Sequence, residues 1–168
     1  MTVSPGSPPA PSVTETILAL LDAAGVPYTR IDHPVVKTSE EAAQTRGTPL
    51  EIGGKSLLLK IGKKPDFRLF VVSASRRTDN RPLRKFLGVQ KLRFARREEL
   101  LAHTGLEPGC VPPFGRPIFE LPVYVDAHLA AGEEIAFTAA DHCVSIRMKM
   151  ADYLSVAQPE AVFSFSRP

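Results

Sequence analysis

Two stretches near the start of the chain carry apolar residues at helical spacing between polar ones. Each opens with a Ser or Thr followed three residues later by Glu, which is the capping box of a helix N-terminus, and each is closed by a glycine. The bracketing residues are Ser12, Glu15 and Gly25 for the first stretch and Thr38, Glu41 and Gly47 for the second. The pattern predicts an amphipathic opening helix and a second, shorter helix. Residues 28–32 are expected to be extended, because His33 precedes a proline.

The period of the apolar pattern then changes. Residues 56–61 and 67–74 are apolar runs of strand length joined by a turn that contains Gly and Pro, which predicts a hairpin. Later segments show both periods, with helices predicted over 80–87, 96–104 and 151–157 and strands over 89–95, 122–126, 134–138 and 144–148. Strands joined by hairpins and by single helices imply an α/β fold with a mixed sheet.

Length and composition favour a single domain. The 168 residues are 43% hydrophobic, which is enough to bury a core without disulfides or metals. Residues 1–12 are rich in proline and lack the apolar segment of a signal peptide, so we expect a disordered tail at 1–12 and one domain over 13–168. No apolar run is long enough to span a bilayer. We expect a cytoplasmic protein with no membrane partner and with Cys110 and Cys143 as free thiols.

Charge is distributed unevenly along the chain. Residues 60–99 carry 13 Lys/Arg and 4 Asp/Glu, a balance of +9, whereas the remainder carries 8 and 14, a balance of −6, which together give the net +3. Such segregation is typical of proteins that bind a polyanion, although a solvated basic face has the same pattern. The aromatic strand signature of RNA-recognition domains is absent, so a module that reads RNA sequence by base stacking is not expected.

Lys55 is the first candidate site residue. The segment GGKS at 53–56 resembles the end of a phosphate-binding loop, but the first glycine of that signature would fall at Pro49 and a strand follows where a helix is required. Period two instead places Lys55 on one strand face with Leu57, Leu59 and Ile61. An ammonium at the rim of an apolar face needs an anion or carbonyl groups to receive it. The alternative is a strand-end lysine that extends into solvent.

The second candidate is the loop at 105–115, GLEPGCVPPFG. Three prolines and three glycines impose an unusual backbone path that can direct successive amides at one point, as an oxyanion receptor requires; a rigid connection is the alternative. The spacing of the histidines and cysteines fits no zinc site, so no metal is expected. A thiol hydrolase that pairs Cys110 with a histidine stays open as a second type of enzyme.

Three motifs together resemble the YbaK and prolyl-tRNA-synthetase-associated deacylase family: GGKSLLLK from 53, TGLEPGCVPPFG from 104 and AFTAADHCVSIRM from 136. The resemblance runs from about residue 13 to 154. It implies a single domain whose mixed sheet is curled into a partly closed barrel with surrounding helices. It also implies hydrolysis, without a cofactor, of a small noncognate amino acid from tRNA, as in alanyl- or cysteinyl-tRNA(Pro). The implied partners are the misacylated 3′ end of tRNA and an aminoacyl-tRNA synthetase.

The resemblance also assigns the site. The strand-opening lysine of the family matches Lys55, which is implied to be the catalytic group. Pocket-lining segments of the family match residues that are implied to bind the substrate: Thr38, Gly105, Pro108, Gly109, Cys110, Phe114, Gly115, Thr138, Ala139 and Ser145. YbaK-like members have glycines and then an aspartate in the third motif, where this chain has Ala139, Ala140 and Ser145. The amino acid removed is therefore left open. A noncatalytic tRNA- or synthetase-binding module of the same fold is the alternative function.

Overall fold

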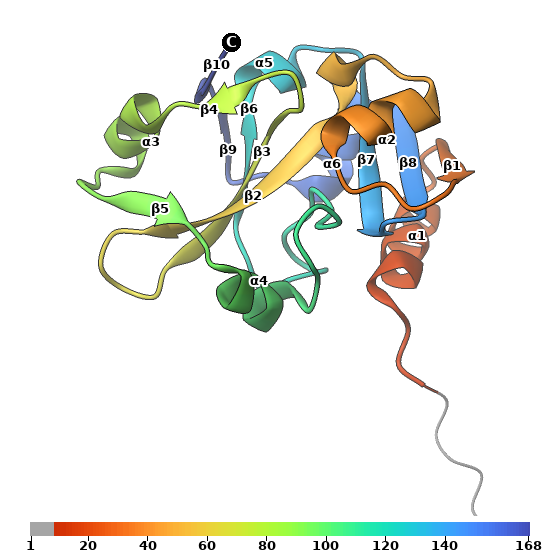
Figure 1. Ribbon diagram of the computed structural model, residues 1–168, viewed down its shortest axis with the longest axis horizontal. Helices are drawn as coiled ribbons and strands as arrows, with labels where there is room; N and C mark the ends of the chain where they lie inside the picture. The colour runs from red at the N-terminus through yellow and green to blue at the C-terminus, as the bar shows by residue number, and fades with distance from the viewer. Residues whose placement is uncertain (1–8) are drawn as a thin grey trace, which may run out of the picture.

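The computed structural model describes residues 9–168 (Figure 1). Most of the tail expected at 1–12 therefore lies outside the described residues, and residues 9–12 are exposed and have no regular structure. Ser12 caps the first helix, since its Oγ accepts a hydrogen bond from the Glu15 amide at 3.1 Å. Thr38 caps the second helix in the same way, through the Glu41 amide. Both predicted helix starts are confirmed, each with the Ser or Thr half of the capping box; the Glu41 carboxylate accepts from the Lys37 amide rather than from Thr38.

The structure has the following elements in chain order: α1 (Val13–Ala24), β1 (Tyr28–Asp32), α2 (Ser39–Arg46), a 3-10 turn (Leu50–Ile52), β2 (Gly54–Ile61), β3 (Phe67–Ser73), β4 (Arg77–Thr78), α3 (Asn80–Leu87), β5 (Leu92–Phe94), α4 (Arg97–Thr104), β6 (Val123–Asp126), α5 (Ala127–Ala130), β7 (Glu134–Asp141), β8 (Val144–Lys149), α6 (Met150–Ala157), β9 (Ala161–Phe163) and β10 (Ser166–Arg167). The predicted helices and strands are all present, although the strand expected at 89–95 is shortened to β5. The short elements β4, α5, β9 and β10 were not predicted, because two to four residues are too few to show a period.

The strands within residues 9–168 form three sheets. The largest has the order β5-β2-β3-β6-β9, with antiparallel pairing from β5 to β3 and parallel pairing from β3 to β9, so the predicted mixed sheet is confirmed. A second, antiparallel sheet has the order β1-β8-β7, and β10 pairs with β4. Figure 1 shows the three-stranded sheet and α1 on one side of the molecule and the five-stranded sheet with α3 on the other. The fold is a single-domain α/β fold.

The expected partly closed barrel is wrong, because in the described part of the chain neither large sheet closes on itself or on the other. There the two sheets meet at one isolated bridge, between Gly53 and Ala136. From Gly54 onward β2 pairs with β3, and β7 pairs with β8, so no continuous ladder runs between the sheets. The close approach at the bridge depends on a missing side chain, since a Cβ on Gly54 would lie 2.8 Å from Cδ1 of Ile135.

Two cores cover the two faces of the five-stranded sheet. The larger core fills the space between the sheets and includes side chains of α1 and α6, such as Ile17, Leu21 and Tyr153. The smaller core lies beneath α3, whose Leu83 packs over Phe70 and Phe165. No helix in the described part of the chain is both long and apolar enough to cross a bilayer.

Candidate active site

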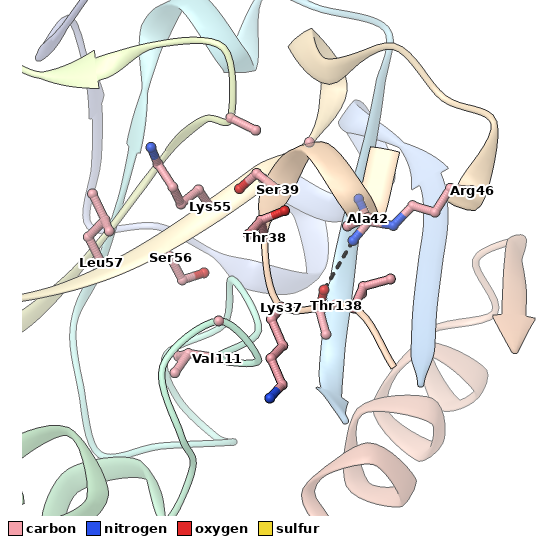
Figure 2. A pocket seen from close by; sticks show the side chains of 15 residues that line it. Lys37, Thr38, Ser39, Ala42, Arg46, Lys55, Ser56, Leu57, Val111 and Thr138 are labelled. Atoms are coloured by element: carbon pink, nitrogen blue, oxygen red, sulfur yellow. Dashed lines mark hydrogen bonds between the residues drawn. The ribbon is translucent and has the colours of Figure 1, made fainter. Parts of the chain in front are cut away.

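A cavity of about 320 Å³ opens where the two large sheets meet. Its wall is built from the start of β2, from the loop before α2 and α2 itself, from Thr138 of β7, and from Gly109 and Val111 of the loop at 105–115. Four of the residues that the sequence singled out line this one cavity: Thr38, Lys55, Gly109 and Thr138. Segments that are far apart in the sequence are therefore brought together at the isolated bridge between the sheets (Figure 2).

Lys55 enters the cavity wall from the start of the β2 ladder. Its face of the strand is the one predicted, since Leu59 and Ile61 lie in the smaller core on that face. The Nζ atom donates a hydrogen bond to the carbonyl oxygen of Arg76 at 3.4 Å. Burial lowers the pKa of Lys55, an effect that nearby Glu40 opposes and Arg77 reinforces. The ammonium is thus partly desolvated and held by a carbonyl rather than by a carboxylate.

The loop that precedes α2 is tied to the turn between β7 and β8. The His33 amide donates to the carbonyl of Cys143, and the Val36 amide donates to the carbonyl of His142. The His142 ring returns a bond from Nδ1 to the carbonyl of Val36 at 2.9 Å. These contacts hold Thr38 at the mouth of the cavity, beside the N-terminus of α2.

Arg46, in the last turn of α2, reaches the outer face of the three-stranded sheet. Its Nε donates to Ser145 Oγ at 2.8 Å, and a terminal nitrogen donates to Thr138 Oγ1 at 3.1 Å. Thr138 and Ser145 are opposite each other in the ladder between β7 and β8. Ser145 is fully buried and also contacts Nε2 of His33 at 2.7 Å. Burial lowers the pKa of Arg46 to about 10.

The loop at 105–115 contributes fewer contacts than the sequence suggested. Gly109 faces the cavity with a φ of 92°, a left-handed conformation that favours glycine. Cys110 is buried behind the wall, where its thiol donates to the Glu107 carbonyl at 3.3 Å and burial raises the thiol pKa. Its amide also points to the Glu107 carbonyl, at 3.4 Å. A buried thiol with a raised pKa is a poor nucleophile, which argues against the Cys–His hydrolase.

The remaining predicted residues lie outside the cavity wall. Gly105 ends α4, and Pro108 is exposed in the turn before Gly109. Phe114 is in the core, with its ring centroid 5.5 Å from those of Phe137 and Tyr153, and Gly115 packs against the backbone of Leu121. Ala139 is fully buried on the core side of β7. Any effect of these residues on the cavity is indirect.

Several cavity residues were missed from the sequence. The polar ones among them are Lys37, Ser39, Arg46 and Ser56. The Ser56 hydroxyl is buried and has no hydrogen-bond partner in the described part of the chain. An arginine in the last turn of a helix is what the helix dipole favours on any surface helix, so the sequence carried no signal that Arg46 faces a cavity. Three cations and four hydroxyl side chains line the wall, and none of its residues is Asp or Glu, which suits an oxygen-rich or anionic ligand.

Potential metal ligands are scattered. Within residues 9–168 no group of three or more His, Cys, Asp or Glu side chains is close enough together to hold a metal ion. Both cysteines are free.

Comparisons with known proteins identify the family of this chain. The family model for the aminoacyl-tRNA editing domain matches residues 33–156. A multifunctional Ser/Thr-tRNA deacylase of Escherichia coli, ProXp-y, is 33% identical over 156 residues, which cover 90% of this chain and 92% of the deacylase. A proline–tRNA ligase of Xanthomonas campestris is 29% identical over 141 residues, or 83% of this chain and 24% of the ligase.

A solved structure has a similar fold. A crystal structure assigned as a trans-editing enzyme for prolyl tRNA synthetase superposes with a TM-score of 0.78 and 26% identity, covering 95% of this chain and 100% of the other. The family model spans the cavity segments from Val36 to Thr138, so the match includes the site as well as the core. The chain belongs to the aminoacyl-tRNA editing domain family.

Proposed function

We propose that this protein is a trans-editing hydrolase that removes a small noncognate amino acid from misacylated tRNA. The observation that carries the proposal is the cavity, where Lys55, Gly109 and Thr138 meet in a space of about 320 Å³ in a chain of the editing family. That volume suits an aminoacyl group with part of the terminal ribose. Relatives named as a Ser/Thr-tRNA deacylase and as a trans-editing enzyme support the same activity.

In the proposed reaction a water oxygen attacks the ester carbonyl and the bond to the ribose oxygen breaks. The products are the free amino acid and tRNA with its terminal hydroxyl restored. The ammonium of Lys55, held by the Arg76 carbonyl, stabilises negative charge on the carbonyl oxygen or the neighbouring phosphate. The Gly109 amide is the second donor proposed for the oxyanion, because the Cys110 amide is directed at Glu107. A ribose hydroxyl of the substrate activates the water.

The proposed substrate is tRNA in the cytoplasm, and the proposed partner is an aminoacyl-tRNA synthetase. The basic residues at 60–99 begin on the strand that carries Lys55, so they can attract the tRNA backbone next to the cavity. In the ligase of X. campestris the matching region is part of a synthetase, which supports association with such an enzyme. Besides alanine and cysteine, the name of the E. coli relative makes serine and threonine candidates.

The first prediction is that Lys55→Ala lowers the deacylation rate by about 100-fold or more while the protein stays folded. Removal of one preorganised charge donor costs on the order of 10²–10³ in rate, whereas a strand-end lysine contributes little to stability. The assay is timed release of amino acid from Ala-, Ser-, Cys-, Thr- and Pro-tRNA, with folding followed by circular dichroism.

Lys60→Ala is the matched control, because Lys60 lies on the same strand and on the opposite face. At saturating tRNA its deacylation rate should stay within about twofold of the wild-type rate, because Lys60 does not line the cavity and one cation of the basic segment at 60–99 affects tRNA affinity rather than the chemical step. A wild-type protein that binds these tRNAs and hydrolyses none of them would favour the noncatalytic binding module. Full turnover by Lys55→Ala would remove Lys55 from the mechanism.

A further inference from the structure

We propose that Arg46 and Thr138 form a subsite that selects an aminoacyl group with an oxygen on its side chain, such as seryl or threonyl. This inference rests on the proposed deacylase function and assigns a specificity-determining role to Arg46. Four observations carry it: the unpaired charge of Arg46, the direction of its hydrogen bonds, its position relative to Lys55, and the donor character of the groups around it.

Arg46 is a cavity residue without a counter-charge. Its side chain bonds two hydroxyl oxygens, and no acidic side chain in residues 9–168 forms an ion pair with it. By contrast, Arg147 on the same face of the sheet is paired with Glu134 at 2.6 Å. A guanidinium carries five N–H donors, and the two hydroxyls occupy two of them. The others are available to a ligand, and leaving them unmet in a closed site is costly.

His33, Ser145, Arg46 and Thr138 form a chain of hydrogen bonds. The groups at its two ends, the Pro34 carbonyl and the Arg46 guanidinium, determine which atom donates in each bond. Nδ1 of His33 lies 2.8 Å from the Pro34 carbonyl, which can only accept, so Nδ1 donates this bond; in the tautomer with its single proton on Nδ1, Nε2 is an acceptor. Ser145 therefore donates its proton to His33 Nε2 while its oxygen accepts from Arg46. The one proton of Ser145 is thereby used within the protein, and its oxygen orients Arg46. Thr138 accepts from Arg46 and keeps its own proton for a ligand.

Arg46 and Lys55 lie on opposite sides of the cavity (Figure 2). On the side of Lys55 are Arg76, whose carbonyl receives the ammonium, and Arg77, which is close enough to lower the Lys55 pKa. These two arginines belong to the basic segment at 60–99, so the phosphates and terminal ribose approach from that side. The aminoacyl side chain is then directed toward Arg46.

The groups at that end are donors. Guanidinium N–H groups and the Thr138 hydroxyl match a side-chain oxygen, whereas an alanyl group would leave them unpaired and a thiol sulfur is only a weak acceptor. A site built to hydrogen-bond a substrate hydroxyl discriminates strongly against the analogue that lacks it. Alanine and serine differ by this one oxygen, so they form the decisive pair of substrates.

The test compares Ser-, Thr- and Ala-esters of one tRNA body, using the wild type, Arg46→Met and the control Arg147→Met. Arg46→Met should lower kcat/KM for seryl- and threonyl-tRNA by about 10- to 100-fold, and should change alanyl-tRNA by less than about threefold. Arg147→Met should leave the seryl-to-alanyl ratio at the wild-type value. A decrease of equal size on all three esters would overturn the inference, as would an effect confined to tRNA affinity at low salt.

Two further variants keep the inference testable if Arg46→Met does not fold. Thr138→Val is nearly isosteric and removes only the hydroxyl, and Ser145→Asp supplies the missing counter-charge to Arg46. Both should lower the seryl-to-alanyl ratio in the same direction as Arg46→Met, and an unchanged ratio in both would contradict the subsite. A wild type inactive on every ester would instead remove the proposed function, so the two failures are distinguishable.

Discussion

Single side chains in this cavity differ in whether the polar group faces the ligand or the protein. Lys55 and Thr138 line the cavity, and the Lys55 ammonium is held there by the Arg76 carbonyl. The thiol of Cys110 lies behind the wall and is turned to the Glu107 carbonyl. Cys110 lies next to the cavity residue Gly109 in sequence. The orientation of the Cys110 side chain therefore decides whether its thiol could act as a nucleophile or only packs in the protein interior.

Cys110→Ala is therefore expected to keep deacylation within about threefold of wild type, since a buried thiol of raised pKa supplies little thiolate. The change should cost stability, on the order of 1 kcal/mol for the buried sulfur that is removed. Initial rates on one misacylated tRNA and urea unfolding curves measure the two effects. A folded Cys110→Ala protein whose rate had fallen by several orders of magnitude, with an acyl-enzyme trapped in the wild type, would restore the thiol mechanism.

Among the elements, the two-residue strands β4 and β10 connect the C-terminal segment to the candidate catalytic residue Lys55. Asp126 is fully buried at the end of β6, and it accepts bonds from the Phe165 amide at 2.8 Å and from Ser166 Oγ at 2.6 Å. Ser166 Oγ in turn accepts from Arg76 Nε at 2.8 Å, and the Arg76 carbonyl receives Lys55. The pairing of β10 with β4 thus braces the segment that holds the ammonium.

Ser166→Ala should lower kcat on a short aminoacyl-nucleoside by about 3- to 10-fold with little change in KM. The change removes a hydrogen bond that positions Arg76, whose carbonyl accepts from Lys55, and it does not affect a contact with the substrate. It should also cost about 1–3 kcal/mol of stability, since Asp126 loses a buried partner. Ser166→Thr keeps the hydroxyl and should restore kcat. Exposed Ser164 provides the control variant Ser164→Ala. A kcat unchanged in Ser166→Ala would show that β10 has only a structural role.

For the whole molecule, the segregated charge leaves several arginines exposed, and one of them, Arg77, lies near Lys55. Arg77, Arg81 and Arg84 are exposed on β4 and α3, and Arg77 is close enough to Lys55 to affect its pKa. Arg76 differs from them, because its side chain is engaged by Ser166. The position of the exposed arginines fits long-range attraction of a phosphate backbone rather than contact with the ester.

Replacing Arg77, Arg81 and Arg84 together by Glu should weaken tRNA binding and flatten its dependence on salt by about one unit of slope for each phosphate that is no longer neutralised. Hydrolysis of a short aminoacyl-nucleoside should be nearly unchanged. Filter binding over a range of salt concentrations measures the slope, and Arg30→Glu with Lys149→Glu tests exposed cations outside residues 60–99. Unchanged tRNA affinity in the triple variant would make these exposed arginines a solvated face.

Local patterns in the sequence were sufficient for most elements. Capping residues and glycines mark the two ends of α1 and of α2. They could be predicted because the free backbone groups at a helix end form hydrogen bonds with residues only a few positions away. Period two predicted the hairpin of β2 and β3 and the face that Lys55 shares with Leu59 and Ile61. The motifs also identified the editing family and brought Lys55, Gly109 and Thr138 forward as site residues.

The tertiary structure decided how the sheets meet and which side chains face the cavity. Whether β2 joins β7 in a closed ladder depends on one bridge between residues 83 positions apart, and no local pattern encodes such a contact. In the sequence, Arg46 looks like an ordinary basic residue at the C-terminal end of a helix. Its hydrogen-bond partners, the hydroxyls of Thr138 and Ser145, are 92 and 99 positions away. The sequence by itself determined the elements and the family, because short-range spacing specifies them; only long-range packing determined the cavity wall and the burial of Cys110.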